Sequence, residues 1–233
     1  MQWLKEYWQD RKKLQKVFPE AVFFLKKRPF AGRLKIWENG RLKALARAEL
    51  EQLFEIEFVD GLYFESPRSL KKVVHSCFRA RKFEEITRED EWFGLYYATE
   101  MQGACQPPVY LKWTGPYKGF GLFAEKDLEA GTFIGEYAGL VRRHFKPLDR
   151  ANAYCFEYPM DLTGKSPFTI DAKTSGNAAR FINHSPAPNL ELLRAYGGGV
   201  MHILLRTLGP VVKDTELTYD YGPGYWRRRP RPL

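Results

Sequence analysis

The chain has 233 residues, of which 44% are hydrophobic and 15% aromatic, enough to bury the core of one large domain or two small ones. No run approaches the roughly 18 apolar residues that a membrane span needs, and the charged N-terminus does not resemble a secretory leader. The net charge of +9 includes four arginines in the basic tail over 227–233. Such a tail suits weak DNA contact, and its alternative is a solvated chain end.

The three cysteines bear on both compartment and metal binding. Cys77, Cys105 and Cys155 are too few and too scattered for a disulfide framework, which favours a reducing, cytoplasmic compartment. His75 lies two residues from Cys77, but no second pair of ligands accompanies them. We therefore expect no metal site.

The first hundred residues predict a mainly helical N-terminal domain over 1–102. Apolar residues recur at helical spacing over 2–17 and 41–58. A serine N-cap followed by proline predicts a third helix over 66–78. The "ENG" of 38–40 also fits a hairpin turn, an alternative that the sequence leaves open.

From residue 103 the pattern changes to many short strands. Glycine and proline separate β-branched and aromatic runs about every ten residues, as in 119–124, 131–141, 153–159, 168–172 and 200–208. No helical segment alternates with these runs, which excludes a doubly wound parallel sheet. The "KGFG" glycines lack the third glycine of a dinucleotide-binding loop, so a Rossmann site is rejected.

Four sequence motifs follow one another in this second part of the chain. They read "KGFGLFAEKDLEAGTFIGEYAGLV", "AYCFEYP", "TIDAKTSGNAARFINHSPAPNL" and "ELTYDYG". Together they resemble the SET-domain family, enzymes that transfer methyl groups from S-adenosylmethionine to lysine. The resemblance implies an α+β, mostly-β SET fold over 103–226, with small curved sheets. It also implies a pseudoknot in which "RFINHS" and "ELTYDYG" interlock.

The resemblance assigns a set of cofactor-binding residues. Asn183 and the backbone of His184 would hold S-adenosylmethionine, so the His184 ring is neither a general base nor a metal ligand. The backbone of the glycine loop, residues 118–121, would face the amino-acid end of the cofactor. The whole set is Lys118, Gly119, Phe120, Gly121, Arg180, Phe181, Asn183, His184 and Tyr221.

Tyrosines make up the catalytic and substrate-binding set. By resemblance, Tyr221 lies beside the transferring methyl and the amine, and Tyr137 and Tyr154 line the lysine channel. Loss of hydration in such a channel lowers the pKa of the lysine and favours its neutral, nucleophilic form. The predicted catalytic residues are Tyr221, Tyr154 and Tyr219, and the substrate-binding residues are Tyr137, Tyr154 and Tyr219. The Tyr219 hydroxyl would hold a water molecule in the space that a further methyl group needs. We therefore expect the product to stop at mono- or dimethyl-lysine.

The sequence departs from many family members beyond the "NHS" segment. Pro186 stands where they carry a zinc-binding cysteine, and no cysteine follows Cys155. We expect Tyr225 or Trp226 to pack on the adenine or wall the channel instead; the alternative is a surface aromatic that anchors the tail. Stand-alone SET proteins of this kind resemble those of bacteria and viruses.

These features lead to one functional prediction and its alternatives. The leading prediction is methylation of a lysine in a histone or histone-like protein. The expected setting is a bacterial effector of cytoplasmic origin that is secreted into a host cell and acts in its nucleus. One alternative is methylation of a non-histone protein lysine, and another is a catalytically silent SET-fold docking module. A DNA-binding role for 1–102 ranks last because its helices mix both charges.

Overall fold

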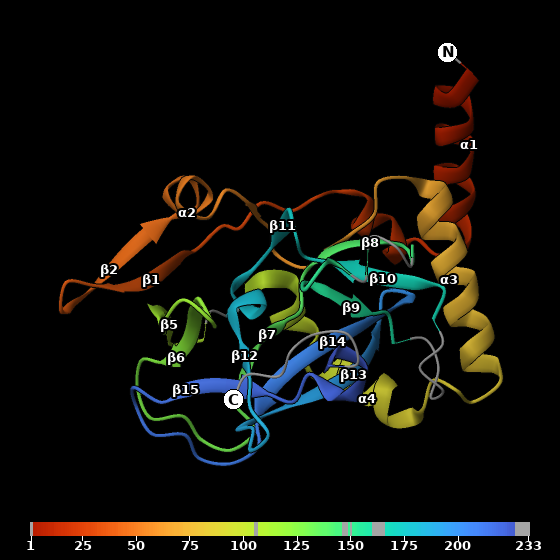
Figure 1. Ribbon diagram of the computed structural model, residues 1–233. Coiled ribbons are helices and arrows are strands. Elements are labelled where there is room, and N and C mark those ends of the chain that lie inside the picture. The colour runs from red at the N-terminus through yellow and green to blue at the C-terminus, as the bar shows by residue number, and fades with distance from the viewer. Residues whose placement is uncertain (1, 105–106, 146–148, 150, 160–165, 227–233) are drawn as a thin grey trace.

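The computed structural model describes residues 2–104, 107–145, 149, 151–159 and 166–226 (Figure 1). Its longer helices are α1 (Gln2–Val17), α2 (Arg47–Phe54), α3 (Pro67–Lys82) and α4 (Arg88–Tyr96), and its shorter ones are η1 (Glu20–Leu25), η2 (Glu100–Ala104), η3 (Ala178–Phe181) and α6 (Gly222–Trp226). The predicted basic tail over 227–233 lies outside the described residues.

The strands form several small sheets rather than one large one. The six-stranded sheet has the order β12-β15-β6-β5-β1-β2, the four-stranded sheet β4-β8-β10-β9, the three-stranded sheet β13-β14-β7, and β11 pairs with β3. Their bounds are β1 (Arg33–Glu38), β2 (Arg41–Ala46), β3 (Glu57–Phe58), β4 (Leu62–Tyr63), β5 (Val109–Trp113), β6 (Phe120–Ala124), β7 (Phe133–Glu136), β8 (Gly139–Arg143), β9 (Cys155–Glu157), β10 (Phe168–Asp171), β11 (Ser175–Gly176), β12 (Asn183–His184), β13 (Leu190–Gly197), β14 (Val200–Thr207) and β15 (Glu216–Tyr219). Helices together with many small sheets confirm the predicted α+β class.

The predicted helix over 41–58 is wrong, and the hairpin alternative is correct. β1 and β2 pair antiparallel around Asn39 and Gly40, whose φ angles are 50° and 79°. Asn-Gly readily adopts this left-handed backbone, so the turn dominates the weak helical spacing of the leucines that follow. Only α2 of the predicted helix forms. The helices predicted over 2–17 and 66–78 are confirmed as α1 and α3, and the Ser66 hydroxyl accepts the Ser69 N–H at 3.2 Å.

Strands from the N-terminal third join the sheets of the rest of the chain. β1 pairs in parallel with β5, β3 with β11, and β4 with β8. All three pairings cross the domain boundary predicted at 102/103. The buried core is likewise continuous, since Leu50 and Leu70 belong to the same cluster as Leu111 and Leu122. Removing this apolar surface from water ties the two parts together.

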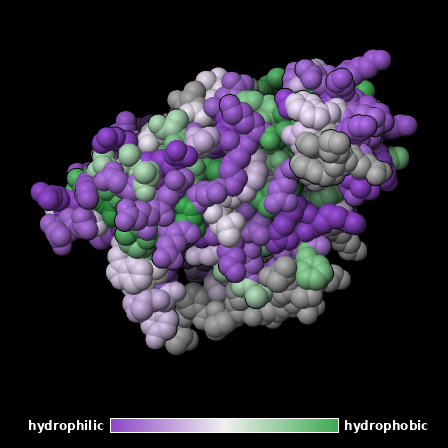
Figure 2. All heavy atoms as spheres, turned by 90° about the horizontal axis from the view of Figure 1, so that it is seen from above, coloured by the Kyte–Doolittle hydropathy of each residue, from purple (hydrophilic) through white to green (hydrophobic). Residues whose placement is uncertain are grey.

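Most of the surface seen from above is hydrophilic, with apolar residues in small patches (Figure 2). Among the described residues, no helix combines the length and the apolar character that a membrane crossing requires.

Helix α4 packs against β13 through a contact that tolerates only glycine. A Cβ atom added to Gly94 would lie 1.8 Å from the Tyr196 carbonyl oxygen, which belongs to the backbone. Alanine normally favours a helix over glycine by about 1 kcal/mol, but this clash forces the helix and strand apart. We expect Gly94→Ala to lower the free energy of unfolding by about 1–3 kcal/mol, measured by urea denaturation. Gly135→Ala is the control because nothing lies within 4 Å of its added Cβ, and equal stability of the two variants would contradict this packing.

Candidate functional site

The segments that carry the motifs meet at one end of the six-stranded sheet. β12 pairs in parallel with β15, with Asn183 opposite Thr218 and His184 opposite Tyr219. β15 pairs antiparallel with β6 on its other side, so the glycine loop before β6 reaches the same place. In Figure 1 these three strands lie side by side below the β1–β2 hairpin. This is the juxtaposition that a pseudoknot between "RFINHS" and "ELTYDYG" requires.

A small polar cradle forms where the glycine loop meets β12 and β15. The Asn183 side-chain amide donates to Glu216 Oε1 at 2.7 Å, and Lys118 Nζ lies 3.9 Å from Glu216 Oε2. A Cβ on Gly121 would lie 2.6 Å from Glu216 Oε1 and 3.1 Å from Asn183 Nδ2. Gly119 adopts a left-handed φ of 71°, which favours glycine. The Glu216 and Asn183 side chains therefore pack directly on the backbone at Gly121, an approach that only glycine allows.

Glu216 was not among the predicted site residues, although it is the first residue of "ELTYDYG". It connects Lys118 and Asn183, two residues that the resemblance assigns to the cofactor. Its backbone carbonyl also accepts the Asn189 side-chain amide at 2.8 Å. An acidic residue at the start of a strand is common on protein surfaces, so the sequence pattern alone does not mark Glu216 as a site residue.

The His184 ring serves as a packed, hydrogen-bonded support. Its Nδ1 accepts the backbone N–H of Tyr221 at 3.2 Å, so the ring proton of the neutral form is on Nε2. The ring centroid lies 5.4 Å from that of Tyr221 and 4.7 Å from that of Trp226. Among the residues that the structure describes, no cluster of His, Cys, Asp or Glu side chains is placed to hold a metal ion.

A run of aromatic rings connects the predicted channel residues. The Tyr219 and Tyr221 ring centroids are 4.7 Å apart, that of Phe156 is 6.4 Å from Tyr219, and that of Tyr137 is 5.3 Å from Phe156. Tyr137 and Tyr219 are 5% and 7% exposed, whereas Tyr154 is 38% exposed and marks the outer end. Phe156 belongs to this aromatic run and was missed by the sequence prediction, although it lies two residues after Tyr154.

Two contacts hold Tyr154 in place. The Tyr137 hydroxyl donates to the Tyr154 carbonyl oxygen at 3.0 Å, and the Arg180 guanidinium lies 4.0 Å from the centre of the Tyr154 ring. Arg180 Nε in turn donates to the Ala172 carbonyl oxygen at 3.0 Å. The structure therefore places Arg180, a predicted cofactor residue, against the exposed Tyr154 ring, where a cation and an aromatic face attract each other.

Two other predicted cofactor residues pack chiefly into the core. The Phe181 ring centroid is 4.7 Å from that of Phe54, and the Phe120 ring centroid is 5.1 Å from the same Phe54 ring. Phe181 also stacks on Phe58, 6.3 Å between centroids. Helix α2, which carries Phe54, thereby supports the backbone on which the cradle residues are mounted.

The buried tyrosines remain protonated. Burial raises the pKa of Tyr137, Tyr219 and Tyr221 well above the usual value of a phenol. The Tyr221 hydroxyl accordingly donates to the Ile182 carbonyl oxygen at 2.8 Å. Such hydroxyls can orient a substrate by hydrogen bonding, but they cannot act as tyrosinate bases at neutral pH.

The sequence profile described as "SET domain" matches residues 119–222. This part of the chain is a SET domain. The chain is 37% identical over 109 residues to the human histone-lysine N-methyltransferase 2B, with 44% of this chain and 4% of that protein covered. It is 31% identical over 132 residues to the Drosophila melanogaster histone-lysine N-methyltransferase Su(var)3-9, with 52% and 21% covered. The chain thus spans only a small part of these relatives' length.

A solved structure of KRYPTONITE, in complex with mCHH DNA, an H3(1-15) peptide and SAH, is also similar to this chain. The identity is 32%, the TM-score is 0.42, and the match covers 49% of this chain and 23% of that one.

The segment that follows β15 packs back onto the SET domain. In α6, the Trp226 ring lies nearly parallel to that of Tyr221, with an interplanar angle of 10° and 6.0 Å between centroids, and the Tyr225 ring is 4.6 Å from Tyr221. The Trp226 indole N–H is buried and has no hydrogen-bond partner among the described residues. A buried donor without a partner is costly, and it is satisfied when a ligand brings an acceptor.

These features fit S-adenosylmethionine. The polar pair of Asn183 and Glu216 and the Trp226 indole beside His184 offer both polar and aromatic groups to one ligand. Of these, His184 and Trp226 lie against the Tyr221 ring. The aromatic run therefore begins beside the polar cradle, at Tyr219 and Tyr221.

Proposed function

We propose that the chain is an S-adenosylmethionine-dependent protein-lysine N-methyltransferase. One observation carries the proposal: an aromatic run, in which Tyr137 and Tyr219 are buried and Phe156 and Tyr221 partly buried, adjoins the polar cradle of Asn183 and Glu216. A narrow apolar channel next to a cofactor cradle aligns an amine with a methyl donor, which is the main requirement of an in-line displacement. The match to SET-domain histone-lysine methyltransferases supports the same reaction.

On the cofactor side, each cradle residue has a defined part. Asn183 and the backbone of His184 would hold the cofactor, and Lys118 and Gly119 to Gly121 would bound its amino-acid end. Trp226 would cover it and supply its indole N–H. When bound, S-adenosylmethionine supplies an electrophilic methyl group on a sulfonium.

On the substrate side, the channel strips water from the lysine. Desolvation lowers the pKa of the lysine amine and favours the neutral nucleophile, so the protein does not need a strong base. The aromatic faces of Tyr154 and Tyr137 first attract the charged ammonium. The protonated Tyr221 hydroxyl then orients the amine through a hydrogen bond.

Tyr219 is the residue expected to limit the number of methyl groups. It is 7% exposed, and its ring lies between those of Phe156 and Tyr221. Removing its hydroxyl leaves room for a further methyl without changing the ring contacts. We expect Tyr219→Phe to shift the main product from mono- or dimethyl-lysine to the next methylation state, measured by intact mass of the substrate. An unchanged product distribution would contradict this role.

We also propose a histone or histone-like protein as the substrate, because the matched relatives are histone-lysine methyltransferases. We further propose that the protein is a bacterial effector that acts in a host nucleus. Labelled-methyl transfer to a panel of core histones and bacterial histone-like proteins tests the substrate class. Transfer to ribosomal or metabolic proteins alone would favour the non-histone alternative.

Direct cofactor binding separates the enzyme from a silent docking module. Calorimetric titration with S-adenosylmethionine should show binding to the isolated chain. Binding together with methyl transfer supports the proposal. If the chain does not bind the cofactor and does not methylate any protein, it is a docking module with a SET fold.

A further inference from the structure

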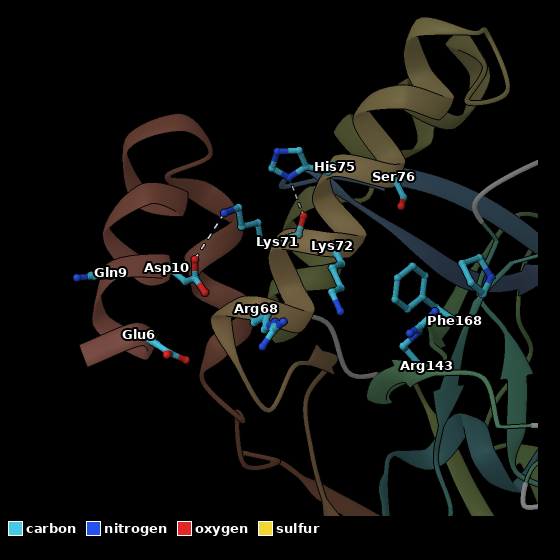
Figure 3. Close-up of a pocket in the computed structure, with 11 residues that line it drawn as sticks. Glu6, Gln9, Asp10, Arg68, Lys71, Lys72, His75, Ser76, Arg143 and Phe168 are labelled. Carbon is cyan, nitrogen blue, oxygen red and sulfur yellow. Dashed lines mark hydrogen bonds and ion pairs between the residues drawn. The ribbon is translucent and has the colours of Figure 1, made fainter. Parts of the chain in front are cut away.

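A charged groove lies away from the proposed methyl-transfer site. It has a volume of about 790 Å3 and runs between α1, the N-terminal half of α3 and the end of β8. None of the cradle or channel residues lines it. Its charged residues are Arg68, Lys71, Lys72, Arg143, Glu6 and Asp10 (Figure 3).

Three of the four cations in this groove form no ion pair within the described part of the chain. Lys71 Nζ lies 3.5 Å from Asp10 Oδ1, which neutralises one pair. For Arg68, Lys72 and Arg143, by contrast, no ion pair with any described residue is present. Glu6 is the one remaining carboxylate among the lining residues, so the wall has an excess of positive charge.

The three free cations are arranged around one space. Arg68 and Lys72 are one helical turn apart and project from the same side of α3, and Arg143 approaches from β8, across from Lys72 (Figure 3). All three side chains are exposed. A metal ion would be repelled by this set, and an apolar ligand would have to remove water from three charges. An anion fits best.

The spacing favours a polymer of anions over a single one. Residues four apart on a helix have Cβ atoms about 5–6 Å apart, while each strand of a nucleic acid duplex carries a phosphate about every 3.4 Å along its axis. Arg68 and Lys72 can thus reach separate phosphates of one strand. The net charge of +9 would steer such a polyanion toward the protein.

We propose that the groove between α1 and α3 binds the phosphate backbone of nucleic acid through Arg68, Lys72 and Arg143. The contacts are ionic and do not read sequence. This binding surface is separate from the lysine channel, so it stands whether or not the chain methylates lysine. In a methyltransferase it would keep the enzyme near proteins that are themselves bound to nucleic acid.

The test is fluorescence anisotropy of a short, labelled, mixed-sequence DNA duplex with the full chain and no cofactor. Each phosphate contact contributes about −0.9 to the slope of log affinity against log salt. Three contacts contribute about −2.7, which corresponds to a fall of about 40-fold between about 50 and 200 mM salt. The triple variant Arg68→Gln, Lys72→Gln, Arg143→Gln should lose at least about tenfold in affinity at low salt, and its slope should be shallower by about 2.7.

A matched variant removes the same charge elsewhere. Arg41→Gln, Lys43→Gln, Lys126→Gln changes three exposed cations outside the groove, and its affinity should stay within about twofold of wild type. Any contact of the basic tail is common to both variants. Thermal melting confirms that both are folded.

Three outcomes would overturn the proposal. The first is no DNA binding by the wild type at low salt. The second is an equal loss of affinity in the two triple variants, which would mean that net charge alone is responsible. The third is tighter binding of polyglutamate than of DNA through the same three residues, which would assign the groove to an acidic protein partner.

Discussion

Tyr221→Phe should reduce the rate of methyl transfer by about 100- to 1,000-fold, the usual effect of losing one positioned donor or acid–base group. The substitution keeps the ring and therefore the packing against Tyr219, Tyr225 and Trp226. What it removes is the hydroxyl, which donates to the Ile182 carbonyl oxygen at 2.8 Å and which we propose orients the amine. The measurement is single-turnover transfer of labelled methyl from S-adenosylmethionine.

The cofactor affinity of the variant identifies the affected step. We expect the Kd for S-adenosylmethionine, measured by calorimetry, to stay close to that of wild type because no cradle side chain changes. Tyr117→Phe is the control for loss of a tyrosine hydroxyl, since Tyr117 is 99% exposed. If Tyr221→Phe transferred methyl at the wild-type rate, the hydroxyl would have no part in catalysis. A parallel loss of cofactor binding would assign it to the cradle instead.

The parts of the site that could be predicted from the sequence are those in which a short segment fixes both residue type and place. The "NH" of Asn183 and His184 and the Tyr219 of "ELTYDYG" lie on strands that pair directly, and Tyr221 follows two residues after the second strand. The sequence prediction missed residues that belong to the site only because they contact side chains from distant segments. Phe156 matters because it touches Tyr137 and Tyr219, and Glu216 because it touches Asn183.

In the fold, too, features set by neighbouring residues could be predicted, whereas contacts between distant segments could not. The N-cap of α3 and the Asn39–Gly40 turn are local, and both are legible in the sequence. The parallel pairing of β1 with β5 is not, because it joins Lys35 to Tyr110 without any nearby turn to set the register. Leucines at three- and four-residue spacing also fit a helix and a twisted hairpin alike, which is why the helix over 41–58 was predicted too long.

Gly121→Ala should weaken cofactor binding by about tenfold or more. The added Cβ would lie 2.6 Å from Glu216 Oε1 and 3.1 Å from Asn183 Nδ2, closer than ordinary contacts allow. Relief of this overlap must shift the Glu216 carboxylate and so disturb its 2.7 Å hydrogen bond with the Asn183 amide. Overpacking of this kind costs about 1–3 kcal/mol, and 1.4 kcal/mol corresponds to tenfold in Kd. Calorimetric titration with S-adenosylmethionine measures the change.

The matched control is Gly209→Ala, because an added Cβ there meets nothing within 4 Å. It should bind the cofactor as wild type does, and thermal melting of both variants separates a local change from unfolding. Asn183→Ala leaves Glu216 without the amide donor and should weaken binding in the same direction as Gly121→Ala. Because both substitutions act on one hydrogen bond, the double variant should be no weaker than the worse single one. Additive losses would show that Gly121 and Asn183 contact the cofactor independently, and wild-type affinity in Gly121→Ala would place the cofactor elsewhere.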